Sequence, residues 1–158
     1  KVLPSGLETT ISAIELNRDQ VEEAFRGEAV IIHLAEDLDV SRGNTIVPID
    51  QLPQTEKSLE ATICWMDNSP FQPGQKLLLQ QNSFRTKAVL KELTGKIDIH
   101  TYEQLESDGS LKLNDFAHVT IKTAEAVSAD PYKQNRKTGA FILINENTNN
   151  TVAAGIFN

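Results

Sequence analysis

The chain has 158 residues, of which 39% are hydrophobic and 6% aromatic, and its formal net charge is −7. This apolar content is enough for a packed core, and the composition does not indicate disorder. No apolar run approaches the roughly 18–20 residues of a membrane-spanning helix, and the start has no basic segment followed by an apolar one. The single cysteine cannot form an internal disulfide, which fits a reducing compartment. We therefore expect a soluble, cytoplasmic protein without a membrane segment.

The negative charge is concentrated at the start of the chain. Residues 1–50 carry 4 Lys/Arg against 10 Asp/Glu, a balance of −6, and residues 51–158 carry 11 against 12, a balance of −1. Nucleic-acid binding draws much of its affinity from cations. No run of basic residues interleaved with aromatic ones is present that would stack bases. The charge pattern argues against nucleic acid as a partner.

The first third of the chain predicts short strands with one helical turn. Residues 9–16, TTISAIEL, and 28–34, EAVIIHL, are rich in β-branched residues, and the second run suggests burial on both faces. Between them, DQVEEAF at 19–25 resembles a helix start, because Asp19 could cap and Glu22 lies three residues later. A further short strand is expected at 45–47.

A polar, proline-containing segment, DQLPQTEK at 50–57, indicates a domain boundary at about residue 53. We expect the domains to be residues 1–52 and 53–158. Pro73 and Gly74 predict a type II turn. Strands are expected at 60–66, 76–81, 84–93, 96–100, 117–123, 139–145 and 151–157. Many short strands separated by turns indicate an all-β protein with antiparallel β-barrels, the second of them complete.

The sequence has no recognisable catalytic, nucleotide-binding or metal-binding motif. The phosphate-binding loop G-x-x-x-x-G-K-[ST] is absent, as are G-x-G-x-x-G, H-E-x-x-H and C-x-x-C. The histidines, His33, His100 and His118, are too scattered to provide three convergent metal ligands; the last two favour solvated positions. Cys64 lies in an apolar strand and is interpreted as a small core residue rather than a nucleophile. We expect no catalytic, cofactor-binding or metal-binding residue in this chain.

Two charged clusters remain. The acidic residues Glu36, Asp37 and Asp39 lie on a connection between strands and favour a solvated loop. The basic residues Lys133, Arg136 and Lys137, in PYKQNRKTG, are the candidate contact with an anion or a partner. A solvated loop is the alternative interpretation of that basic group.

Three long stretches resemble the elongation-factor-Tu superfamily. Residues 25–47, FRGEAVIIHLAEDLDVSRGNTIV, are similar to the end of its domain 2. Residues 60–95, EATICWMDNSPFQPGQKLLLQQNSFRTKAVLKELTG, are similar to the opening of its domain 3, and 139–157, GAFILINENTNNTVAAGIF, to its closing strands. The combination of DVSRG with NRKTGAFILI most resembles the GTPase subunits of bacterial sulfate adenylyltransferase. His100, Asn145 and Ala154 depart from that family's usual residues.

The resemblance implies translation-factor-like barrels: part of domain 2 in 1–52, and domain 3 in 53–158. It implies a parent that hydrolyses GTP and supports adenylylation of sulfate by ATP in sulfate assimilation, with GTP and Mg²⁺ held by a domain before residue 1. The barrels themselves would be inactive and need no cofactor. They would support the GTPase domain and dock the catalytic subunit.

The same patterns allow one alternative function and imply one expectation about the oligomeric state. A translation-factor-type barrel could instead bind RNA or a translation partner, although the net charge of −7 argues against this. If the first barrel is incomplete, its strand edges are unpaired, and unpaired edges invite another chain. We therefore expect a dimer or strand exchange through residues 7–47.

Overall fold

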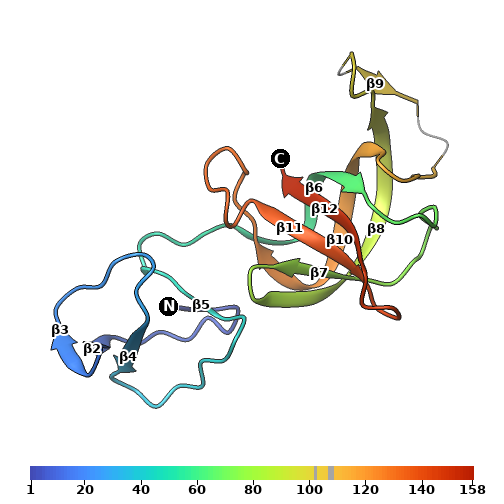
Figure 1. Ribbon diagram of the computed structural model, residues 1–158. Coiled ribbons are helices and arrows are strands. Elements are labelled where there is room, and N and C mark those ends of the chain that lie inside the picture. Colours follow the sequence, from blue (N-terminus) through green and yellow to red (C-terminus); the bar gives the residue numbers. More distant parts are fainter. Residues whose placement is uncertain (102, 107–108) are drawn as a thin grey trace. The chain divides into compact units, whose positions relative to one another are not determined.

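The computed structural model describes residues 1–101, 103–106 and 109–158, which form strands and turns without any helix. Over these residues, nothing qualifies as a helix that could cross a lipid bilayer. The chain divides into two compact units, Lys1–Leu52 and Pro53–Asn158, which are described separately (Figure 1). The predicted all-β fold class is confirmed.

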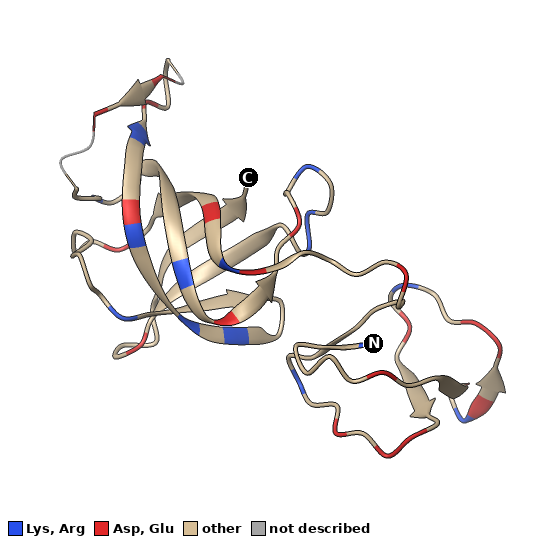
Figure 2. Ribbon diagram, turned by 180° about the vertical axis from the view of Figure 1, so that it is seen from behind, with Lys and Arg blue, Asp and Glu red and all other residues tan. Residues whose placement is uncertain are grey.

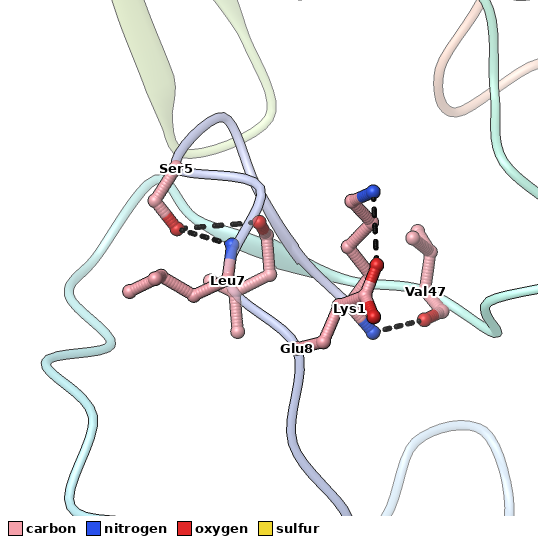
Figure 3. Close-up of polar contacts among 6 residues, drawn as sticks. Lys1, Ser5, Leu7, Glu8 and Val47 are labelled. Atoms are coloured by element: carbon pink, nitrogen blue, oxygen red, sulfur yellow. Dashed lines mark hydrogen bonds and ion pairs between the residues drawn. The ribbon is translucent and has the colours of Figure 1, made fainter.

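The first unit contains two small antiparallel sheets. Strand β1 (Val2–Leu3) pairs with β5 (Thr45–Ile46). In the other sheet, β2 (Ile11–Leu16) lies between β3 (Asp19–Val21) and β4 (Val30–Leu34). The terminal ammonium of Lys1 donates to the carbonyl of Val47 over 2.8 Å, and Lys1 Nζ lies 3.1 Å from Glu8 Oε1 (Figure 3). The contact with Val47 extends the β1–β5 pairing at its end, and the ion pair joins Lys1 to the segment before β2.

The helical turn predicted at 19–25 is wrong, because the chain forms a β-hairpin there. Asn17 and Arg18 have φ values of 52° and 76°, and Leu16 pairs with Asp19 across them. Two consecutive residues with positive φ match the twist of the flanking strands in a two-residue hairpin. The turn at residues 17–18 therefore overrides the capping pattern that follows it.

The expected burial of strand 28–34 on both faces is also wrong. Ile31 is 60% exposed, and Ile32 is exposed as well. Within residues 1–52, all of which the structure describes, Val2 is the only buried hydrophobic side chain. Five short strands in two separate sheets enclose too little space to bury the apolar residues that the pattern provides.

The second unit is a closed barrel of six antiparallel strands. The sheet order is β10-β6-β12-β11-β7-β8-β9, and β10 also pairs with β8, which closes the ring. The six ring strands are β6 (Thr55–Trp65), β7 (Leu77–Gln81), β8 (Phe84–Ile97), β10 (Phe116–Ser128), β11 (Ala140–Asn145) and β12 (Thr151–Phe157). The short strand β9 (Gln104–Leu105) pairs with the end of β8 outside the ring. Closure gives each ring strand a neighbour on both sides, which removes exposed edges over most of the ring.

The predicted separate strand at 96–100 is not formed. Strand β8 continues through Gly95 to Ile97 and then turns at Asp98, whose Oδ1 accepts the N–H of His100 at 2.7 Å. Gly95 leaves room for a neighbour: a Cβ there would lie 2.3 Å from the side-chain nitrogen of Gln104. The glycine therefore allows a close approach by β9 and does not end the strand.

The barrel interior follows the alternation read from the sequence. Ala61, Ile63 and Trp65 of β6 are buried. The ring of Trp65 meets Phe71 edge-on, with centroids 5.6 Å apart, and Phe141 stacks on Phe157 at 4.6 Å. Offset and edge-on pairs of this kind add to the stabilisation from burial itself. The predicted turn at 73–74 is present, with a φ of 81° at Gly74.

Cys64 faces outward between two buried neighbours, so its interpretation as a core residue is wrong. Its side chain is half-buried, and its thiol is free. Burial, and to a smaller extent the negative charge of Asp115, raises the pKa of the thiol. A raised pKa keeps the thiol protonated near neutral pH, which makes it a weak nucleophile.

Candidate partner-contact site

The predicted basic residues lie together on the connection between β10 and β11. Lys133, Arg136 and Lys137 are all exposed there, and Figure 2 shows positively charged segments on this connection. We call residues 129–139 the basic loop. The structure thus brings the three candidate residues onto one short segment of the barrel surface.

The basic loop has its own hydrogen-bonded framework. Asp130 Oδ2 accepts Thr138 Oγ1 at 2.5 Å and Asn135 Nδ2 at 3.3 Å. The N–H of Asn135 donates to the carbonyl of Pro131, and the N–H of Gly139 to the carbonyl of Asn135. Asp130 therefore uses its carboxylate inside the loop, and the fixed backbone presents the three cations outward.

Gly139 is needed because the loop folds back onto itself. A Cβ at this position would lie 2.4 Å from the Cα of Tyr132 and 2.6 Å from the carbonyl oxygen of Asn135. Both are backbone atoms, which cannot move away without unfolding the turn. Only glycine allows this close backbone approach.

Both ends of the loop are tied to β7 by one buried side chain, that of Gln81. Its Nε2 donates to the carbonyls of Ser128 at 2.7 Å and Thr138 at 2.5 Å, and the residue is 6% exposed. Sequence reasoning missed Gln81. Its position in the strand could have indicated this role. Gln81 follows Leu77 and Leu79 at every second residue, so its side chain points inward, where a polar group needs hydrogen-bond partners.

The cationic side chains themselves remain available. The guanidinium carbon of Arg136 lies 6.0 Å from the ring centroid of Tyr132, at the limit of a cation–π contact. Asn82 Nδ2 donates to the backbone carbonyl of Lys137 at 3.3 Å. In the described ranges no carboxylate forms an ion pair with any of the three cations. The loop can therefore present positive charge to carboxylate or phosphate groups.

The other sequence candidates lie elsewhere and do not form a site. His33 is paired with Glu15 at 2.9 Å, His100 is exposed as predicted, and His118 Nδ1 lies 3.0 Å from the hydroxyl of Thr62. The acidic residues at 36, 37 and 39 are exposed, as a solvated loop requires. Among the residues that can be described, no three His, Cys, Asp or Glu side chains are grouped closely enough to hold a metal ion.

Residues 58–158 match the family model described as GTP-eEF1A C-terminal domain-like. The chain is 36% identical over 156 residues to "Sulfate adenylyltransferase subunit 1" of Teredinibacter turnerae, covering 99% of this chain and 33% of that protein. It is 37% identical over 156 residues to "Bifunctional enzyme CysN/CysC" of Mycobacterium tuberculosis, covering 98% and 25%. The chain thus spans a quarter to a third of the length of these curated relatives.

A crystal structure of Sup35 complexed with GDP has a similar fold. Its TM-score to this chain is 0.86 at 17% sequence identity, and the match covers 99% of this chain and 38% of that one. At this identity the likeness concerns the fold alone. It supports the translation-factor-like β-barrel architecture that the sequence predicted.

The role of Gln81 in holding the basic loop is testable. We expect Gln81→Met to lower the free energy of unfolding by about 1–3 kcal/mol, because two carbonyls lose their donor while the volume is nearly kept. Gln72→Met, on an exposed residue, is the matched control and should change stability by less than about 0.5 kcal/mol. Urea unfolding measures both. Equal stabilities for the two variants would contradict the clamp.

Proposed function

The chain belongs to the GTP-eEF1A C-terminal domain-like family, and from this premise we propose that it is the non-catalytic barrel region of a sulfate adenylyltransferase regulatory subunit. The parent would hydrolyse GTP in sulfate assimilation, in which ATP and sulfate form adenylyl sulfate. The observation that carries the proposal is the 36% identity, over 99% of this chain, to a protein named as subunit 1 of that enzyme.

Under this proposal the barrels support a GTPase domain and dock the catalytic subunit. GTP and Mg²⁺ are assigned to the parent's GTPase domain, because the residues of this chain do not suit them. The sequence has no phosphate-binding loop. The described segments also lack a cluster of three ligands for a divalent ion. The chain's own contribution is then a surface that a partner recognises.

The basic loop is the proposed contact with the catalytic subunit. Its three cations are exposed and unpaired with carboxylates in the part of the chain that the structure describes, while its backbone is fixed by Asp130 and Gln81. A pre-formed loop loses little conformational entropy when it binds. Charge complementarity at such a loop sets both specificity and association rate.

The docking proposal is tested by titrating this chain into the purified catalytic subunit by calorimetry. We expect saturable binding, weakened about ten-fold or more in Lys133→Gln/Arg136→Gln/Lys137→Gln, because three charged contacts are removed. GTP and ATP should neither bind saturably nor be hydrolysed. Absence of binding to the catalytic subunit would contradict docking. Hydrolysis of GTP by the chain would contradict the non-catalytic assignment, and a tRNA gel shift at moderate salt would favour the RNA-binding alternative.

We also propose self-association through residues 7–47. A groove of about 920 Å³ in the first unit is lined by apolar residues that include Ile11, Ile32 and Ile46, all exposed. Among the described strands, none lies beside the outer edges of β3 and β4, and edge pairing with a second copy would cover both features.

Sedimentation velocity at tens of micromolar tests this self-association. A dimer is expected for the wild-type chain, and Ile32→Glu should yield a monomer, because a carboxylate at this groove-lining position would be buried in the interface. Ile156→Glu, on an exposed isoleucine of the barrel, is the control and should leave the dimer intact. A wild-type monomer would contradict the proposal.

A further inference from the structure

A groove of about 320 Å³ on the barrel combines positive charge with an apolar floor. Three lysines, Lys76, Lys87 and Lys122, line it together with Val89 and Ala124, which supply its accessible apolar surface. The lysines come from the segment before β7, from β8 and from β10. Neither the sequence motifs nor the relatives' names assign any role to this place, which we call the lysine groove.

The groove exists because β8 changes partners at Ala88. Before this residue β8 pairs with β7, whose pairing ends at Leu77 opposite Ala88. After it β8 pairs with β10, beginning with Thr123 opposite Ala88. The register of β10 against β6 also breaks after Lys122. The pairings of β8 with β7 and with β10 therefore meet at one residue, close to a register break in β10 that redirects its side chains.

The charge of the groove is only partly balanced. Lys87 Nζ lies 3.1 Å from Glu146 Oε1, and the N–H of Glu146 faces the carbonyl of Lys76 at 3.5 Å. No carboxylate within residues 1–101, 103–106 and 109–158 forms an ion pair with Lys76 or Lys122. Three cations against one anion leave an excess of two positive charges, on a chain whose net charge is −7.

We propose that the lysine groove docks an extended acidic segment of a partner polypeptide. Carboxylates would lie against the lysines, and an apolar side chain between them would cover Val89 and Ala124, the lining apolar residues that are not buried. The apolar floor favours a peptide over a free anion, because a free anion leaves that floor exposed to water. Lysines on a sheet also serve as protection against edge pairing; in that role they would not create affinity for an acidic ligand.

Glu146 acts in this proposal as an internal competitor for the ligand. Its carboxylate forms an ion pair with Lys87, so an incoming carboxylate must displace Glu146 to reach this lysine. Removing the charge of Glu146 should therefore strengthen binding. A lysine cluster that serves only to protect the edge predicts no such gain.

The probe is a fluorescein-labelled ten-residue peptide of alternating Glu and Val, followed by fluorescence anisotropy with the 158-residue chain at low salt. We expect saturable binding that weakens as salt screens the charges. Lys76→Gln/Lys87→Gln/Lys122→Gln should weaken it about ten-fold or more, and Glu146→Gln should strengthen it about two- to five-fold. A peptide of alternating Lys and Val should not bind.

The matched control is Lys57→Gln/Lys91→Gln/Lys112→Gln, which removes the same number of positive charges from exposed lysines of the barrel that do not line the groove. It should leave peptide affinity within about two-fold, and because it does not alter the basic loop, this outcome is independent of docking to the catalytic subunit. Equal weakening by both triple variants, with both melting cooperatively, would show an effect of net charge and overturn the proposal. No binding by the wild-type chain, or tighter binding of a twelve-nucleotide single-stranded DNA than of the acidic peptide, would overturn it as well.

Discussion

The pairing of β8 with β10 is the constraint on which the second unit depends. It joins the two arms of the sheet into a ring, so the six ring strands all have neighbours on both sides. Because side chains alternate with a period of two, ring closure also fixes which residues face inward. On β10 the fully buried residues Ala117, Val119 and Ile121 alternate with outward-facing His118, Thr120 and Lys122. Closure thus determines both the core and the positions at which charged groups are displayed.

Both proposed binding features lie where the regular pairing of the ring ends. The basic loop begins after β10 and needs a buried amide, that of Gln81, to hold its two ends. The lysine groove lies where β7 begins and the pairing of β8 changes from β7 to β10 at Ala88. Strand ends and bulges are places where a barrel redirects its side chains, which is why they are favourable positions for contacts with a partner.

The sequence predicts the barrel well because its signals are local and periodic. Alternation placed Ala61, Ile63 and Trp65 inward, and Pro73–Gly74 marked a turn that the structure contains. The sequence prediction failed where two local patterns compete. At Asn17–Arg18 the positive φ values form a hairpin turn, which prevails over the helix-capping pattern at 19–25. The basic loop could be predicted by composition, since its cations are adjacent in the chain. The lysine groove could not, because its three lysines come from distant segments.

We infer that the ring of residues 53–158 is a self-sufficient scaffold. Residues 1–52 bury little more than Val2, so their stability depends on contacts from outside this unit. Amide hydrogen exchange of the whole chain, read by peptide mass spectrometry, tests this most directly. We expect slow exchange, set by global unfolding, in β6, β8, β10 and β12, and exchange at least about a hundred-fold faster in β2 and β4. Equal protection of β2, β4 and the ring strands would contradict it, as would rapid exchange along the β8–β10 pairing.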